Sequence, residues 1–302
     1  MFYSARFQLG GLCALFALLV ALGAAGGAGA ATGFMLSGVK KQLFVSDNVE
    51  NVINIYPQAG RYQQLTGQIT QGLNKPLGMF IAAGGDLYVA NQGDGTTSVY
   101  HRGALQPYER LSGGPSAASD VAVDSHGNVY VIGFYTPTIW IYSKGSIRPT
   151  ASLTDSYDAY LYWIAIDSHD NIFVNGDSLS VEEFRVGSKQ ARQLTGITYV
   201  FPGGLAFGPG DVLAVCDGGN AHAGNISFYA PPYDKKSLVT TYPYAGAVEG
   251  IALLPNSDIV WGANYGALAA QLFNVKGRLI GQTSSRGLMG PLGVAVDPAA
   301  AN

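Results

Sequence analysis

Carboxylate, amide and aromatic side chains stand next to several short apolar runs of this sequence. Asp120, Trp163 and Glu249 lie near the start of such runs, whereas Asn175 and Asp177 follow another. A few convergent polar and aromatic groups of this kind are what a pocket uses to orient a ligand. The candidate site residues are Asp120, Trp163, Asn175, Asp177, Asp217, Glu249, Asn264 and Tyr265.

Turn capping is the simpler explanation for several polar residues that follow the apolar runs. Asp and Asn side chains commonly accept hydrogen bonds from nearby backbone amides in turns. We prefer this interpretation for Asp47, Asn91, Asp217 and Asn264.

Histidine and cysteine chemistry is not indicated by the spacing of these residues. His126 and His169 lie in similar Asp-Ser-His segments that read as turns, and only His222 stands in a loop near the other candidates. A zinc site or a general-base histidine is therefore not expected. Cys216 lies inside an apolar run, which is typical of a small buried side chain.

Composition and charge exclude one class of partner. Charged residues make up 12% of the chain, the net charge is −3, and Lys and Arg are scattered. Nucleic-acid binders usually carry a basic stripe, so no nucleic acid is expected. The 41 glycines and 18 tyrosines favour turns and strands over charged helical faces.

The N-terminus reads as a secretory signal peptide over residues 1–30. Arg6 precedes an apolar region from Leu12 to Leu22, and small residues precede a cleavage position ahead of Ala31. We expect a short leader over 31–40 and one domain over 41–302. The protein would then be secreted or periplasmic, with no membrane span in the mature chain. An uncleaved N-terminal membrane anchor is the alternative.

The rest of the chain contains a repeat whose length is close to that of one propeller blade. Equivalent positions at 78, 120, 163, 204, 250 and 293 are separated by 42, 43, 41, 46 and 43 residues. Each begins a short strand, and a second and a third strand follow most copies. Periods of this length are typical of four-stranded propeller blades.

The two ends of the domain complement each other. The sixth copy, Leu292–Val296, has no second strand after it, whereas Gln42–Val45 reads as a second strand with no first strand before it. Pairing these two segments closes a ring. The sequence therefore predicts an all-β, six-bladed propeller of 24 strands, with Gln63–Thr66 and Gln193–Thr195 among the weaker fourth strands. An open β-solenoid is the alternative.

The predicted blades place many polar residues at one end of the central channel. Adjacent strands run antiparallel, so the start of each innermost strand and the end of each second strand meet at the same end. The innermost strands contribute Leu77, Asp120, Trp163, Gly203, Glu249 and Leu292. The loops after the second strands add Asp47, Asn48, Asn91, Gln92, Tyr135, Asn175, Asp177, Asp217, Asn220, Asn264 and Tyr265. Aromatic side chains of the Tyr-rich segment 155–163 are expected to reach this rim.

The repeats resemble those of NHL-type propellers. Pro291–Asp297, Asp124–Val131 and Leu43–Asp47 carry the pattern of a Gly-Val-Ala-Val-Asp strand, a Gly-Asn turn and a Tyr-Val strand. The scaffold is similar to that of the gluconolactonase and strictosidine synthase-like group. The resemblance implies a hard divalent cation, such as Ca²⁺ or Mg²⁺, at the channel mouth, held here by Glu249, Asp120, Asp217 and either Asn91 or Asn175. Gly203 stands where that group offers a ligand Asn.

These observations favour a secreted propeller that acts as a non-catalytic binding or interaction module. A protein, peptide or carbohydrate would bind at the channel mouth, and no cofactor is expected, although Ca²⁺ or another divalent cation is an open alternative. A metal-dependent lactonase or related hydrolase is the second hypothesis, and a propeller-type lyase is the third. The fold alone does not choose among them.

Overall fold

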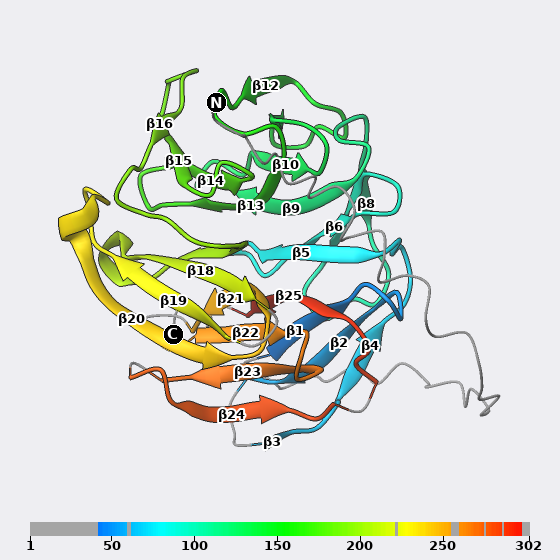
Figure 1. Cartoon of the computed structure of the whole chain (residues 1–302). Coiled ribbons are helices and arrows are strands. Elements are labelled where there is room, and N and C mark those ends of the chain that lie inside the picture. The colour runs from blue at the N-terminus through cyan, green and yellow to red at the C-terminus, as the bar shows by residue number, and fades with distance from the viewer. Residues whose placement is uncertain are drawn as a thin grey trace, which may run out of the picture. The chain divides into compact units, whose positions relative to one another are not determined.

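The computed structural model describes most of the chain after residue 41 as strands. The described residues are 42–58, 62–220, 223–254, 260–274, 276–285 and 287–297. They all belong to the second of two units, which spans residues 35–302 (Figure 1). The predicted signal peptide, the predicted leader and His222 lie outside the described residues.

Six sheets make up this unit, and each is a blade of the predicted kind. From the innermost strand outward, blade 1 contains β25 (Pro291–Val296), β1 (Gln42–Asp47), β2 (Val52–Pro57) and β4 (Gly67–Ile69). Blade 2 contains β5 (Pro76–Ile81), β6 (Leu87–Asn91), β7 (Thr96–Tyr100) and β8 (Glu109–Leu111). Blade 3 contains β9 (Ala118–Val123), β10 (Val129–Gly133), β11 (Thr138–Tyr142) and β12 (Ala151–Thr154).

The second half of the ring repeats this order. Blade 4 contains β13 (Leu161–Ile166), β14 (Ile172–Gly176), β15 (Val181–Phe184) and β16 (Arg192–Gln193). Blade 5 contains β17 (Pro202–Phe207), β18 (Leu213–Asn220), β19 (Ala223–Tyr229) and β20 (Leu238–Ala245). Blade 6 contains β21 (Val248–Leu253), β22 (Val260–Asn264), β23 (Ala269–Phe273) and β24 (Leu279–Thr283). Two short 3-10 helices, η2 (Pro209–Asp211) and η3 (Lys235–Ser237), lie in loops of blade 5.

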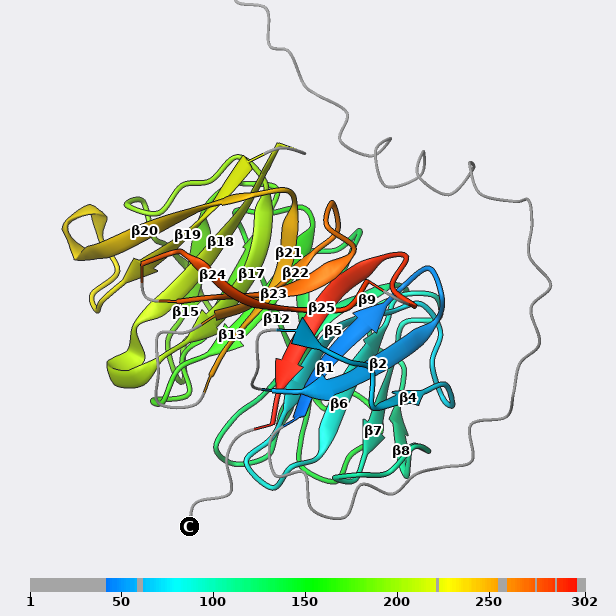
Figure 2. The same ribbon diagram turned by 90° about the horizontal axis from the view of Figure 1, so that it is seen from below.

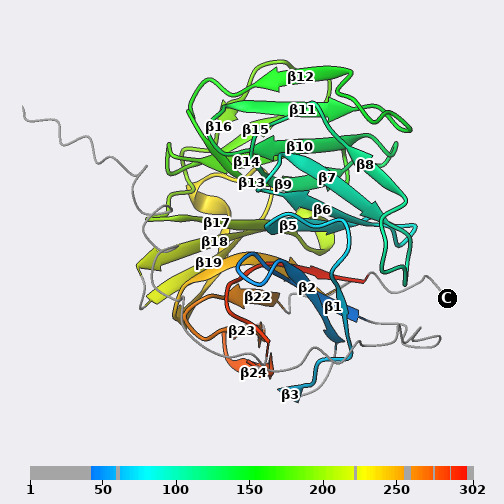
Figure 3. The same cartoon turned by 90° about the vertical axis from the view of Figure 1, so that its right-hand side faces the viewer.

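The six-bladed, all-β fold and its closure are therefore confirmed. β25 pairs antiparallel with β1 through Leu43↔Val296, Phe44↔Ala295 and Val45↔Val294, so the last strand completes the first blade (Figure 2). Figure 3 shows the regular order of the outer strands β10, β11 and β12 in blade 3.

One predicted fourth strand is wrong. Gln63–Thr66 does not pair within blade 1, where Gly67–Ile69 is the outer strand. Instead β3 (Tyr62–Gln63) adds to β24 in parallel, which makes blade 6 a five-stranded sheet. The reason is that the outer edge of β24 offers backbone groups that a passing segment can pair with.

The hydrophobic core is distributed between blades. For example, Val99 and Leu111 of blade 2 belong to one buried cluster with Val121 and Val131 of blade 3. The innermost strands are buried along nearly their whole length, because neighbouring blades cover both faces of each sheet. This explains why their sequences are continuously apolar rather than alternating.

Polar links join neighbouring blades at the end opposite the predicted mouth. Asp124 caps its turn by accepting bonds from the amides of His126 and Asn128, at 2.9 and 2.8 Å. The hydroxyl of Ser125 reaches across to Asp170 of blade 4 at 2.6 Å. The same arrangement repeats one blade further on, from Ser168 to Asp211 at 2.8 Å.

Candidate functional site

The innermost strands are irregular at the end where they begin, which we call the mouth end. In all six blades the pairing between the first and second strand shifts register near this end. A bulge of this kind re-aims the side chain beside it. In blades 3 and 4 the shifts lie next to Asp120 and Trp163, so the simple alternation expected of a strand does not decide where these side chains point.

A cavity of about 220 Å³ lies between the innermost strands. It is lined by residues from the third to the sixth position of these strands, including Asp120, Trp163 and Gly250. The cavity therefore extends from the layer of Asp120 and Trp163 away from the mouth end. Of the predicted entrance residues, Leu77, Gly203, Glu249 and Leu292 do not line it.

Trp163 closes the channel on the side of the mouth end. Its side chain is 6% exposed and belongs to a buried cluster that includes Leu77. Leu292 packs against this cluster. Its indole Nε1 donates to the carbonyl oxygen of Pro202 at 3.3 Å. A Cβ atom at Gly250 of blade 6 would lie 3.2 Å from its ring, so the indole of blade 4 reaches across the centre.

Asp120 is buried in the wall of the cavity and joins blades 3 and 4. Its Oδ1 accepts a bond from the amide of Val121 at 2.9 Å, and its Oδ2 accepts one from the amide of Ile164 at 3.0 Å. Burial raises the pKa of Asp120 to about 8, although the two amide bonds oppose this shift. The position suits a structural tie between blades.

Glu249 and Asp217 do not join Asp120 in a metal site. Glu249 is half-buried, and its burial raises the pKa to about 7. Asp217 accepts bonds from the amides of Val200 and Phe201, each at 3.1 Å. Within the described part of the chain, these three carboxylates do not form a group within ligand distance of one another.

The other predicted rim residues mostly hold loops in place. Asp47 accepts four backbone amide bonds, two of them from residues Met289 and Gly290 before the closing strand. Asn91 accepts from the amide of Asn74 at 3.0 Å and Asn264 from that of Ala267 at 3.0 Å. Asp47 and Asn264 thus cap their own turns as expected, whereas Asn91 and Asp217 accept from amides 16 or 17 residues earlier in the chain.

Asn175 and Asp177 of blade 4 also accept hydrogen bonds from backbone amides. Asn175 accepts from the amide of Trp163 at 3.2 Å and donates to the carbonyl of Gly203 at 2.8 Å, which links blades 4 and 5. Asp177 accepts from the amide of Tyr160 at 3.1 Å. Tyr265 is half-buried in the loop after β22.

Five aromatic rings from three neighbouring blades form a continuous array at the mouth end. We call Phe134, Tyr135, Tyr160, Tyr162 and Phe201 the aromatic array. Successive ring centroids from Tyr160 through Tyr135, Phe134 and Tyr162 to Phe201 are 6.0, 6.3, 5.2 and 6.3 Å apart. Tyr135 is 70% exposed and Tyr160 is 39% exposed.

The backbone of Tyr135 has an unusual conformation. Its φ of 70° lies in the left-handed region, which a bulky residue seldom adopts. Such strain concentrates at functional sites. The sequence predicted that the Tyr-rich segment supplies rim aromatics, but Phe134 and Phe201 were missed, although each lies directly beside a strand end at the mouth.

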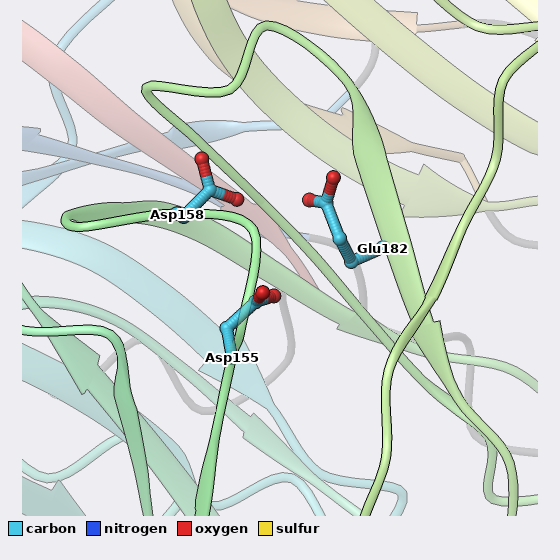
Figure 4. Close-up of side chains that lie close together, drawn as sticks. All are labelled: Asp155, Asp158 and Glu182. Atoms are coloured by element: carbon cyan, nitrogen blue, oxygen red, sulfur yellow. The ribbon is translucent and has the colours of Figure 1, made fainter.

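Three buried carboxylates lie close together in blade 4 and the loop before it (Figure 4). We call Asp155, Asp158 and Glu182 the carboxylate cluster. The two aspartates lie in the loop between β12 and β13, whereas Glu182 projects from β15. Their side chains are 2%, 6% and 0% exposed, and one oxygen of each lies within 4.8 Å of the other two.

Half of the carboxylate oxygens in this cluster have local partners. Asp155 accepts from the amide of Tyr157 at 2.7 Å, Asp158 accepts from the amide of Ser178, and Glu182 accepts from the hydroxyl of Ser178 at 3.1 Å. No amide or hydroxyl group donates to the remaining buried oxygens, Oδ2 of Asp155, Oδ2 of Asp158 and Oε2 of Glu182, but Asp158 and Glu182 share a side-chain hydrogen bond when Glu182 carries a proton.

Burial raises the pKa of all three acids in the cluster. For Glu182 the negative charge of Asp158 adds to the effect of burial. The cluster was not predicted from the sequence. The only local signal is Val181-Glu-Glu-Phe184, where consecutive glutamates in a strand project to opposite faces.

Cysteine and histidine take no part in these features. Cys216 is fully buried, and burial raises the pKa of its thiol. His126 and His169 contact Asp170 and Asp211 at the opposite end, whereas His101 stacks on Tyr108. None of these three described histidines lies in the aromatic array or the carboxylate cluster.

The described residues contain no helix that is long and apolar enough to cross a membrane.

Comparisons with known proteins identify the fold. No protein-family model matches the chain, and no curated protein matches its sequence. A solved chain from "Crystal structure of Nidogen/Laminin Complex" is similar with a TM-score of 0.69 and 10% identity, covering 86% of this chain and 100% of that chain. Because 1333 solved chains match in total, the likeness selects the propeller fold and not a function.

Proposed function

We propose that this propeller is a binding module whose protein partner docks on the aromatic array at the mouth end. The observation that carries the proposal is the continuity of five rings across three blades, with Tyr135 70% exposed at its edge. Exposed aromatic clusters supply most of the energy of many protein interfaces, because each ring buries a large area at a small entropic cost.

The loops that carry the array are held before any partner arrives. Asp177 fixes the amide of Tyr160, and Asp217 fixes that of Phe201. A surface that is already ordered loses less entropy on binding, so such caps favour affinity. Further apolar side chains at the same end, Leu179 and Val200, are 39% and 71% exposed and extend the surface.

A protein partner is preferred over a carbohydrate for two reasons. The array is made of aromatic rings, and the carboxylates beside it already accept hydrogen bonds from backbone amides. In addition, the similar propeller comes from a structure whose title names a complex of two proteins, nidogen and laminin. At 10% identity, this likeness supports only the idea that a propeller of this fold can serve in protein binding.

We further propose a non-catalytic role in a secreted protein. Asp120 and Asp217 each accept backbone amide bonds, and they form no ligand group with Glu249. Residues 1–30 have the pattern of an export signal. Sequencing the N-terminus of exported protein tests this, with cleavage ahead of Ala31 as the expected result.

A peptide-display selection tests the proposed surface. A random peptide library is selected on the purified protein, and enriched peptides are measured by calorimetry against wild type and against Tyr135→Ala and Tyr160→Ala. We expect each substitution to weaken binding by about tenfold, which corresponds to about 1.4 kcal/mol. Tyr108→Ala is the matched control, since Tyr108 is 48% exposed near the opposite end.

Two results would contradict the proposed function. One is a set of enriched peptides that lose affinity with Tyr108→Ala but not with the array variants. The other is turnover of a lactone panel that disappears in Glu249→Ala, which would place a catalytic site at the rim.

A further inference from the structure

We propose that the carboxylate cluster of Asp155, Asp158 and Glu182 is a Ca²⁺ site that fastens the loop between β12 and β13 to β15. The inference does not depend on the proposed binding function. It rests on the convergence of the three side chains, on their buried oxygens that receive no amide or hydroxyl hydrogen bond and on the chemistry of the donor set.

The geometry fits one cation shared by three carboxylates. One oxygen from each residue lies within 4.8 Å of the other two, and Figure 4 shows the carboxylates turned toward a common space. Ca²⁺ binds oxygen at about 2.3–2.6 Å, so two ligands on opposite sides of the ion are about 4.6–5.2 Å apart. The three oxygens are therefore close enough together to share one Ca²⁺.

Three buried oxygens of the cluster point to a missing positive charge. Oδ2 of Asp155, Oδ2 of Asp158 and Oε2 of Glu182 are buried and receive no hydrogen bond from an amide or hydroxyl group, and Asp158 and Glu182 can satisfy each other only if one of them stays protonated. Leaving such atoms unpaired in a protein interior is costly, and three adjacent negative charges add mutual repulsion. A divalent cation would satisfy all three oxygens and offset most of the charge.

The two arginines that follow β15 in the chain, one of them in β16, pair with a different carboxylate. Arg192 and Arg185 both pair with Glu183, the neighbour of Glu182 on this strand. Consecutive strand residues project to opposite faces, so Glu183 has its cations on one face while Glu182 faces the two aspartates on the other. Among the described residues, none of the ion pairs involves Asp155, Asp158 or Glu182.

The chemistry of the ligand atoms favours some cations over others. Three carboxylates with neighbouring serine hydroxyls, Ser178 and Ser180, offer only oxygen, which disfavours Zn²⁺ and suits a hard cation. Mg²⁺ requires nearly ideal octahedral geometry at about 2.0–2.1 Å, which limits opposite ligands to about 4.2 Å. Ca²⁺ tolerates irregular geometry, so it suits ligands that come from an irregular loop and a strand.

Ion binding would order a specific part of the mouth end. The same loop carries Tyr157 and Tyr160, which are 46% and 39% exposed. With Ca²⁺ bound, two of its residues are anchored to a central strand of the blade. The cation thereby sets the position of one end of the aromatic array.

Direct binding to the purified full chain tests the site. After treatment with EDTA and desalting, CaCl₂ and MgCl₂ are titrated separately by calorimetry, and TbCl₃ is titrated with tyrosine-excited luminescence as the readout. Tyr199 makes Tb³⁺ a suitable probe, since its hydroxyl bonds to the carbonyl of Ser180 beside Glu182. We expect one Ca²⁺ per chain, weaker Mg²⁺ binding, Tb³⁺ emission that Ca²⁺ displaces, and a higher Tm with CaCl₂ than with EDTA.

Matched substitutions assign the site. Glu182→Gln and Asp155→Asn should each weaken Ca²⁺ binding by more than about tenfold, because each removes one of three ligand charges. Glu183→Gln alters the adjacent glutamate on the same strand and should leave Ca²⁺ affinity unchanged. Circular dichroism confirms that each variant retains the β-sheet spectrum.

Three outcomes would overturn the proposal. They are the absence of any Ca²⁺ or Tb³⁺ binding by wild type, binding that survives both Glu182→Gln and Asp155→Asn, and a Tm that rises with acidity but ignores CaCl₂. The last would mean that protons, rather than a cation, compensate the charge. Since none of these measurements uses a protein partner, they leave the proposed binding function to its own test.

Discussion

Asp120 and Trp163 occupy a position that is glycine in the other four blades. The equivalents are Gly78, Gly204, Gly250 and Gly293. The innermost strands approach closely here: a Cβ atom at Gly250 would lie 2.7 Å from the carbonyl oxygen of Leu292 and 3.0 Å from the Cα of Gly293. Because those are backbone atoms, they cannot move aside. Two large side chains fill the centre only because four positions carry none.

The buried carboxyl of Asp120 should make stability depend on pH. Burial raises its pKa from 3.8 to about 8, so the folded state binds the proton more tightly than the unfolded state. The stabilisation is complete below pH 3.8 and is lost as the pH rises through about 8. Across this window wild type should lose on the order of a few kcal/mol relative to Asp120→Asn.

Denaturant unfolding of both proteins at pH values from 4 to 9 measures this difference. Asn cannot accept both amide bonds that Asp120 accepts, so a constant offset between the proteins is expected. The readout is therefore how the difference in unfolding free energy between the two proteins changes with pH. Parallel curves for wild type and Asp120→Asn would rule out the titration of this group.

At the scale of elements, the closing strand decides whether blade 1 exists. β25 supplies the innermost strand of a blade whose other strands come from the N-terminal part of the domain. Asp47 reinforces the joint by accepting bonds from Met289 and Gly290, at 2.6 and 3.1 Å. The two ends of the domain are thus held together by backbone pairing and by side-chain capping.

A chain truncated after residue 290 should not unfold cooperatively. It lacks the partner of β1 and exposes Leu43 and Val45, which are fully buried in the intact domain. Adding a synthetic peptide of residues 291–297 should restore a cooperative thermal transition, whereas a scrambled peptide should not. A sharp transition in the truncated chain without peptide would show that closure is dispensable.

At the scale of the whole domain, stability comes from apolar contacts between blades. Six buried clusters lie around the ring, and no covalent cross-link joins the described residues. The free thiol of Cys216 is fully buried, and its Sγ lies 3.2 Å from the hydroxyl of Tyr244.

Reducing agents should therefore leave the Tm of the propeller unchanged. For the same reason a thiol reagent such as DTNB should react with Cys216 only after unfolding, because burial both blocks access and raises the pKa of the thiol. A rate of labelling in native protein equal to that in denatured protein would contradict the assigned burial.

The sequence by itself determined the architecture. A repeat of 41 to 46 residues, apolar runs of strand length and complementary ends leave a six-bladed ring as the arrangement that pairs every strand. These signals are local and periodic, so they are readable without coordinates. Turn capping by Asp47 and Asn264 follows from the same local chemistry.

Only the tertiary structure decided which side chains meet. The bulges beside Asp120 and Trp163, which re-aim these side chains, depend on pairing between strands, whereas the entrance positions were predicted from the antiparallel order of the strands alone. The carboxylate cluster joins a loop to a strand more than twenty residues away, and the aromatic array joins three blades. Contacts of this kind arise from how blades pack together, which a repeat pattern does not encode.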